Sequence, residues 1–355
     1  MPLINYRLLP IYSMSVFRFL TPAVILFFLS NAVSAKSYSI KGQFWASGKL
    51  IENQSNFMME IGYIPTFSAY YELQKSRMVD LEWAYRLDRS YSGNTLDIKN
   101  EKYHRYWVRY SSDKLEARLG LQKIVFGPSQ VLRTLSWFDT IDPEDPTDQT
   151  EGVEASRLRY FPSNSVSLWA WAINNDKDTL SIGGRGELST SLGEWGLTYH
   201  QDPSKSFRII GQGGIPVMGP HNRLALDYRY DGFIGFWNES AIIQSDNMEI
   251  NMIMLGADYT LPIGNGILVM TESMYISSKD NILTSSQTFT SFMASMPMGM
   301  FYNLMLISTL HWNENNSYNY LRFSSAFDSF SINCMASINP REVGNSIQLM
   351  FIYNH

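Results

Sequence analysis

The segment VDLEWAYRLD, residues 79–88, alternates apolar and polar side chains along its whole length. Successive side chains of a β-strand point to opposite faces, so a period of two gathers the apolar residues on one face. A helix would instead need apolar residues every three or four positions. The segment therefore predicts a strand with an apolar face of Val79, Leu81, Trp83, Tyr85 and Leu87 and a polar face of Asp80, Glu82, Arg86 and Asp88.

The same alternation recurs along most of the chain, from residues 37–47 to the last segment near 344–354. Aromatic residues make up 14% of the sequence and charged residues only 17%, against the roughly 25% that is usual in soluble domains. The mean hydropathy is still slightly negative, at -0.16. In a membrane-spanning β-barrel, polar residues that face the lumen alternate with apolar residues that face lipid, and so lower the mean hydropathy of the chain. We therefore expect an all-β fold, a transmembrane antiparallel β-barrel of about 16–18 strands.

Composition also excludes several classes of protein. The net charge of -5 gives no reason to expect a nucleic-acid partner. Cys334 is the single cysteine, which excludes an intramolecular disulfide framework. The expected surroundings of the barrel are outer-membrane lipid.

The N-terminal residues 1–35 have the features of a signal peptide. Arg18 precedes an apolar run from Phe19 to Leu29, and Val33-Ser34-Ala35 supplies small residues for cleavage. We expect a mature barrel over 36–355, exported by a cleaved signal peptide to the outer membrane of a Gram-negative bacterium.

Connections between the expected strands are alternately short and long. Short turns such as Asp231-Gly232 fall on one side of the membrane. We interpret this side as periplasmic, because the periplasmic connections of such barrels are short turns. The longer connections fall on the other side, which we interpret as external. They are 89–100, 123–152, 202–221, 279–285 and 339–343.

The third external loop, residues 123–152, is unlike the others because it is rich in apolar residues that need burial. An external loop can bury Trp137 and Phe138 only by folding into the barrel or packing at its mouth. We therefore expect an inward-folded constriction loop. Its candidate functional residues are Arg133, Trp137, Phe138, Asp139, Asp142, Glu144, Asp145 and Asp148.

Residues 118–162 carry a resemblance to known proteins. The stretches LGLQKIVFGP (119–128), LRTLSWFDTIDPEDPTDQTEGV (132–153) and LRYFPSN (158–164) resemble porin-like outer-membrane barrels of Gram-negative bacteria, and more distantly the alginate-export type of barrel. The last strand, with Ile347, Leu349, Phe351 and Tyr353 on one face, is similar to the signal read by the barrel-assembly machinery. The resemblance implies outer-membrane transport.

Catalysis is not expected. The histidines are scattered over unrelated strands and loops, and no nucleophile motif accompanies them. No His/Cys cluster has zinc spacing, and no cofactor is expected. The acidic residues of loop 123–152 leave a structural calcium ion open, although the EF-hand spacing is absent. The five histidines are His104, His200, His221, His311 and His355.

Alternation also assigns a set of arginines to the lumen. We expect them to form a basic ladder on one wall and to face the acidic loop, either creating a transverse field or pairing with the loop to hold it. The predicted function is a porin-like channel for passive diffusion of small hydrophilic solutes. A polysaccharide-export barrel and a non-conducting, polymer-binding or structural barrel are the alternatives, and the oligomeric state stays open. The ladder comprises Arg86, Arg105, Arg109, Arg118, Arg157, Arg159 and Arg185.

Overall fold

The computed structural model describes residues 37–73, 76–174, 179–210, 214–280 and 284–355. The expected signal peptide, 1–35, lies outside them. The described residues form an 18-stranded sheet and a separate two-stranded hairpin, β10–β11. The strands are β1 (Ser37–Ile51), β2 (Met58–Leu73), β3 (Arg77–Ser92), β4 (Thr95–Ser111), β5 (Leu115–Gln122), β6 (Val153–Ser163), β7 (Val166–Asn174), β8 (Leu180–Thr190), β9 (Gly193–Asp202), β10 (Phe207–Ile210), β11 (Ile215–Met218), β12 (His221–Asp231), β13 (Gly235–Ser245), β14 (Met248–Leu261), β15 (Ile267–Asp280), β16 (Thr284–Met298), β17 (Tyr302–His311), β18 (Asn316–Ala326), β19 (Phe330–Ile338) and β20 (Ser346–Asn354).

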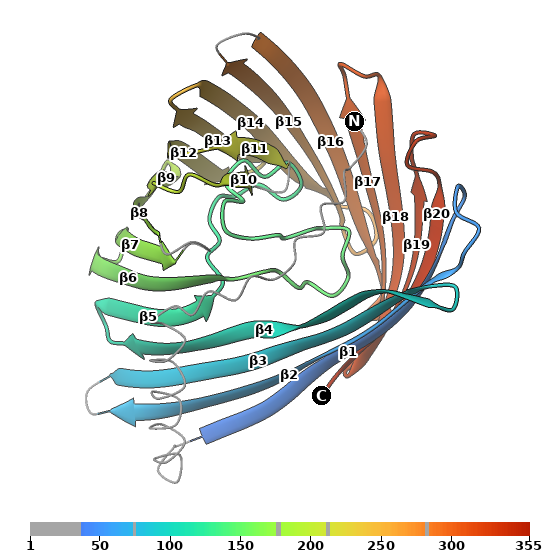
Figure 1. The fold of residues 1–355 in the computed structure, drawn as a ribbon, viewed down its shortest axis with the longest axis horizontal. Coiled ribbons are helices and arrows are strands. Elements are labelled where there is room, and N and C mark those ends of the chain that lie inside the picture. Colours follow the sequence, from blue (N-terminus) through green and yellow to red (C-terminus); the bar gives the residue numbers. More distant parts are fainter. Residues whose placement is uncertain (1–36, 74–75, 175–178, 211–213, 281–283) are drawn as a thin grey trace.

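The large sheet closes on itself (Figure 1). Each of its strands pairs antiparallel with the next one along the chain, and β9 pairs with β12 across the β10–β11 hairpin. Closure comes from β1 and β20, where Trp45 lies opposite Ile352. Within the described residues, closure leaves the 18-stranded sheet without an edge strand, which is what a sheet surrounded by lipid requires. The expected antiparallel barrel is confirmed.

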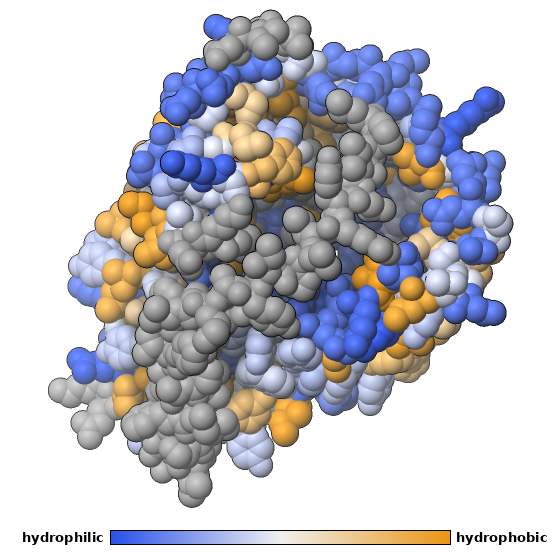
Figure 2. Space-filling model, in the orientation of Figure 1, coloured by the Kyte–Doolittle hydropathy of each residue, from blue (hydrophilic) through white to orange (hydrophobic). Residues whose placement is uncertain are grey.

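The two faces of the barrel differ as the alternation predicts. On β20, outward-facing Ile347 is 67% exposed, whereas inward-facing Met350 is 5% exposed. Large apolar side chains are likewise exposed on the outside of nearly every strand, and Figure 2 shows such side chains on the outer flank over β6–β8. Among the described residues, no helix is long and apolar enough to cross a membrane.

Two expected loops differ from the structure. Residues 89–100 belong mostly to β3 and β4, which continue to a tight turn where Gly93 has a φ of +59°. Tyr91, Leu96 and Ile98 are the only large apolar residues in 89–100, too few to show a clear period of two among polar side chains such as Arg89, which pairs with Glu101. Residues 202–221 contain the β10–β11 hairpin. Its four-residue strands are too short to show a period.

Three inward-facing tryptophans each lie over a glycine on the neighbouring strand. The pairs are Trp45 with Gly62, Trp171 with Gly183 and Trp237 with Gly256. A Cβ on Gly183 would lie 2.6 Å from Nε1 of Trp171, and one on Gly62 or Gly256 would overlap the indole ring. All three tryptophans are buried. Each glycine thus makes the space in which an indole lies flat against the wall.

Replacing Gly256 with alanine should therefore destabilise the barrel by about 1–3 kcal/mol, because the added methyl group overpacks the wall under Trp237. The measurement is the unfolding free energy of refolded protein, followed by tryptophan fluorescence. Gly186→Ala is the matched control, since a Cβ there would meet only Leu168, at 3.7 Å. Equal effects of the two substitutions would show that the indole does not need the glycine.

Candidate functional site

Loop 123–152 occupies the interior of the barrel (Figure 1). It has no regular secondary structure, yet Ile124, Leu135, Trp137 and Phe138 are all buried. The inward-folded third loop predicted from the sequence is confirmed.

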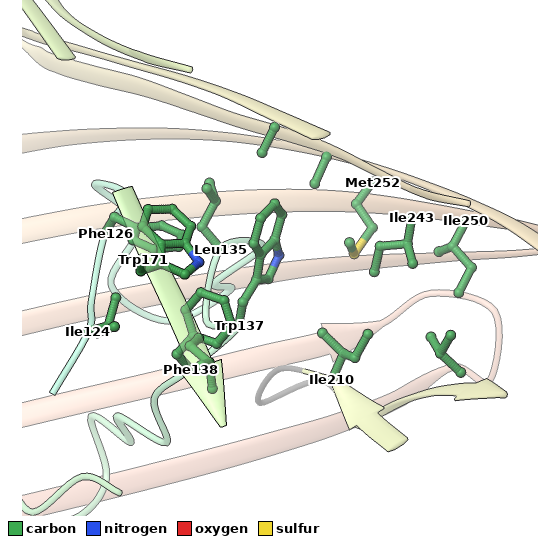
Figure 3. Close-up of a cluster of buried hydrophobic side chains, with 14 of the residues drawn as sticks. Ile124, Phe126, Leu135, Trp137, Phe138, Trp171, Ile210, Ile243, Ile250 and Met252 are labelled. Carbon is green, nitrogen blue, oxygen red and sulfur yellow. The ribbon is translucent and has the colours of Figure 1, made fainter. Parts of the chain in front are cut away.

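One set of contacts that holds the loop is aromatic (Figure 3). Phe126 stacks on Trp171 of β7 with ring centroids 5.8 Å apart, and Trp137 meets Phe126 edge-on at the same distance. Phe138 lies 4.9 Å from the ring of His200. Burial of each large apolar side chain stabilises the docked loop by about 1.5–3 kcal/mol. Further side chains from β12–β14 and the β10–β11 hairpin complete the cluster, including Ile210, Val217, Ala225, Ile243, Ile250 and Met252.

The second set of contacts consists of two fully buried carboxylates on β13 and β15. Glu272 of β15 accepts hydrogen bonds from the backbone N–H groups of Gln130, Val131 and Leu132 at 2.7, 2.9 and 2.6 Å. Glu239 of β13 accepts from those of Ser129 and Leu135, at 2.9 and 3.1 Å. Both side chains are 0% exposed. Five loop amides are therefore satisfied by two charges, and such charge-assisted bonds are the strong ones.

The close approach at Glu239 explains one glycine. Gly127 has a φ of +90°, and a Cβ on it would collide with Oε1 of Glu239. A side chain at this position would suffer both backbone strain and a clash. Glycine therefore lets the chain turn directly over the carboxylate.

Glu239 and Glu272 were not among the residues predicted from the sequence. The sequence held one signal for Glu272, because this carboxylate stands alone between the inward-facing Met270 and Met274. Residues 250–261 and 266–276, in β14 and β15, carry apolar side chains on both faces. On the inner face the contact is with the loop, because Leu132 packs in a cluster with Trp237, Met254, Met270 and Met274.

The acidic residues of the loop fall into two groups. Asp139 pairs with Arg133 within the loop, and both are buried. Asp142, Glu144 and Asp145 lie at the tip, which crosses to the far wall. There the backbone carbonyl of Glu144 accepts a hydrogen bond from the Tyr320 hydroxyl at 2.7 Å. Asp148, at a φ of +54°, is exposed beyond the tip.

A cavity of about 360 Å³ separates the loop tip from strands β1–β3 and β18–β20. Hydrophilic side chains gather over this part of the loop, inside the ring of strands (Figure 2). Enclosure and the neighbouring Asp142 carboxylate raise the pKa of Glu144 to about 7. Lys49 and Arg322 oppose this rise. The charged lining residues are Lys49, Glu60, Arg86, Asp142, Glu144 and Asp145.

Carboxylates dominate the unpaired charge in this cavity. Among the described residues, no ion pair within 4.0 Å holds Glu60, Asp142, Glu144 or Asp145. One oxygen of Glu60 accepts a hydrogen bond from the indole N–H of Trp45 at 2.8 Å. The Asp145 carboxylate accepts one from the Thr147 hydroxyl. The cavity therefore presents more negative than positive charge to its contents.

The seven predicted ladder arginines all lie on inward-facing positions of β3–β6 and β8, but they do not face the acidic tip as a group. Arg86 alone lines the cavity. Glu116 of β5 lies 3.5, 3.6 and 2.7 Å from Arg109, Arg118 and Arg157. Further wall carboxylates pair with Arg86 (Asp88), Arg159 (Glu187) and Arg185 (Glu187 and Asp227), and Asp80 is a second partner of Arg109.

Two ladder residues donate to backbone carbonyls of the loop: Arg105 to that of Thr150 at 2.6 Å and Arg157 to that of Lys123 at 3.5 Å. Tryptophans separate several of the others, with Arg118 4.4 Å above Trp107 and Arg159 3.9 Å above Trp169. The wall is thus a network of guanidinium groups, carboxylates and indoles that is largely neutralised within itself.

The histidines form no catalytic arrangement in the described part of the chain. His200 is 1% exposed and accepts the indole N–H of Trp171 at 3.2 Å. His311 stacks on Phe289 and contacts Glu314. Within the same residues, no three His, Cys, Asp or Glu side chains come close enough together to hold a metal ion.

Replacing Glu272 with glutamine should loosen the loop, because one neutral acceptor replaces a carboxylate that binds three amides. Each charge-assisted bond contributes about 1.5–3 kcal/mol, so an arginine-specific protease should cut after buried Arg133 at least about tenfold faster. Cleavage after exposed Arg341 serves as the internal reference.

Glu249→Gln is the control, since Glu249 lies at the exposed end of β14 and bonds only Asn251 among the described residues. Unchanged cleavage after Arg133 in the Glu272 variant would mean that the apolar contacts alone hold the loop.

No family model and no curated protein matches this sequence. Several solved outer-membrane porins have a similar fold. OccK2 (OpdF) of Pseudomonas aeruginosa aligns over 89% of this chain and 96% of its own, with a TM-score of 0.62 and 9% identity. OccD3 (OpdP) of the same organism aligns over 90% of this chain and 91% of its own, with a TM-score of 0.57 and 8% identity. OmpF of Salmonella typhi, in complex with daunomycin, aligns over 91% of this chain and 99% of its own, with a TM-score of 0.56 and 8% identity. The likeness is one of fold: this chain shares the closed antiparallel barrel of the outer-membrane porins.

Proposed function

We propose that this protein is a porin-like channel of the Gram-negative outer membrane, through which small hydrophilic solutes diffuse passively. The observation that carries the proposal is the charged cavity between the loop tip and the wall of β1–β3 and β18–β20. The apolar outer face supports a place in lipid, and the inward loop gives the lumen a narrow point. No cofactor or energy source enters this function.

The loop is proposed to act as the constriction. Its base is fixed to β13 and β15 through Glu239 and Glu272, and its aromatic residues fill the side of the lumen next to β7. Solutes would pass the tip, where Asp142 and Glu144 lie across from Lys49. The ladder arginines would line the wall beyond, with their charge reduced by Asp80, Glu116, Glu187 and Asp227. Charged groups at a narrow point set ion preference.

Export and assembly complete the proposal. Residues 1–35 would direct the chain across the inner membrane as a cleaved signal peptide. The last strand, β20, would be read by the barrel-assembly machinery through its apolar outer face.

Polysaccharide export is the alternative that the resemblance to alginate-export barrels suggests. A polymer needs a wide and continuous path, whereas here a loop with five clamped amides crosses the lumen. The docked loop therefore favours small solutes.

Single-channel recording in a planar lipid bilayer tests the function. The full-length protein should conduct discrete steps, and deletion of residues 128–148 should enlarge the step, because the proposed constriction is removed. Folding of the deletion variant is checked by its heat-modifiable migration. A folded wild-type barrel without conductance would instead identify a non-conducting structural or binding barrel. Equal steps in both proteins would remove the constriction role from the loop.

Ion preference should depend on pH through Glu144. Because its pKa is raised to about 7, this carboxyl is mostly neutral at pH 6 and mostly ionised at pH 8. The cavity gains negative charge as pH rises, so the reversal potential in a salt gradient should shift toward cation selectivity. Glu144→Gln should flatten this dependence, whereas Glu342→Gln, in an exposed turn, should keep it. A Glu144→Gln channel with the full pH response would place the titrating group elsewhere.

A further inference from the structure

The β10–β11 hairpin folds onto the barrel wall instead of standing free. Ile210 and Val217 are 3% and 1% exposed, and both belong to the apolar cluster that holds the constriction loop. Where the hairpin meets the wall, a polar cluster is enclosed. It consists of Asp202 at the end of β9, Arg208 of β10, and His221 and Arg223 of β12.

The two guanidinium groups of this cluster converge on one carboxylate oxygen. Oδ2 of Asp202 lies 3.0 Å from Nε of Arg208 and 3.9 Å from Nη2 of Arg223. Oδ1 of the same carboxylate accepts the backbone N–H of Ser204 at 2.9 Å. Among the described residues, Asp202 is the one carboxylate within 4.0 Å of either arginine. Two permanent positive charges thus share a single negative one.

His221 does not supply the missing negative charge. Its Nδ1 lies 2.9 Å from the carbonyl oxygen of Gly219, which can only accept, so Nδ1 donates. Its Nε2 is then the acceptor for Nε and Nη2 of Arg223, at 3.2 and 3.0 Å. Nη1 of Arg223 is left over.

Each arginine of the cluster leaves a donor without an acceptor. Nη1 of Arg223 and Nη2 of Arg208 are buried and have no hydrogen-bond partner among the residues that the structure describes. The side chain of Arg223 is only 4% exposed. An uncompensated charge and unpaired donors in such a place are strongly destabilising unless something satisfies them. A small anion would supply both the charge and the acceptor.

We propose that this cluster binds a small inorganic anion of the chloride type between Arg208 and Arg223. The anion would accept from the free Nη groups of both arginines and balance the second guanidinium charge. The low exposure of Asp202, His221 and Arg223, 2–4%, restricts the site to a small ion. It is a structural site, separate from the charged cavity at the loop tip.

The bound anion would also steady the constriction loop. The guanidinium of Arg223 lies 5.6 Å from the ring of Trp137 and 5.8 Å from that of Phe138. A fixed Arg223 therefore presents a fixed cationic surface to these loop aromatics. The anion would join the hairpin, the seam between β9 and β12, and the loop into one unit.

Thermal unfolding of the full-length protein in detergent tests the site. At equal ionic strength, sodium chloride should raise the melting temperature above its value in sodium gluconate, saturably and by about 3 °C, as expected for a ligand that binds only the folded state. Crystals soaked in sodium bromide should show an anomalous peak within hydrogen-bond distance of Nη1 of Arg223 and Nη2 of Arg208.

Arg208→Gln and Arg223→Met should each abolish the chloride response and the bromide peak. Arg229→Gln is the matched control, because Arg229 lies on the same strand but pairs with Asp231 at its exposed end. Arg208 is partly exposed and its variant should fold, so it decides the matter if the Arg223 variant does not. Equal melting temperatures in the two salts, no bromide peak at the cluster, or a full chloride response in Arg208→Gln would each overturn the proposal.

Discussion

The interior of this barrel is organised by two buried carboxylates. Glu239 and Glu272, both 0% exposed, receive five backbone N–H groups from residues 129–135. Unpaired, those amides would make an irregular segment too costly to bury. Paired, they allow the loop to lie against β13 and β15. The position of the aromatic cluster, the crossing of the tip and the cavity beyond it follow from this anchorage.

The arginine-rich wall solves a related problem with opposite charges. Arginines on the inner face of β3–β8 would repel one another, yet Glu116 pairs with three of them at once. Asp80 is a second partner of one of these three, and Glu187 and Asp227 pair with other arginines. Indoles of Trp107 and Trp169 separate the guanidinium planes. Because side chains in such a network fix one another, the wall keeps a defined shape while remaining polar. The loop tip, in contrast, carries carboxylates that no ion pair among the described residues holds.

Much of this architecture could be predicted from the sequence, because the outer face of nearly every strand carries exposed apolar side chains. A period of two in segments such as 79–88 identifies strands, and the apolar content of 123–152 predicts its inward fold. Contacts between distant residues leave no such pattern. Glu239 and Glu272 are isolated charged residues within largely apolar strands. The pairing of Arg157 with Glu116 depends on the register between their strands. The hairpin of β10 and β11 was missed because four residues are too few to show a period.

The separation between the loop and its anchors has a consequence for how the molecule is made. Ser129 binds a carboxylate 110 residues further along the chain, and Gln130 binds one 142 residues away. The barrel itself closes only when β20 meets β1. Contacts between such distant residues form late, because ordering the intervening chain costs entropy first. The loop therefore lacks the carboxylates that anchor it until β15 is in place. A chain halted before β15 would form a partial, open sheet with no loop docked against its inner face. Obstruction of the lumen is thus a late event in folding, set by where two glutamates stand in the sequence.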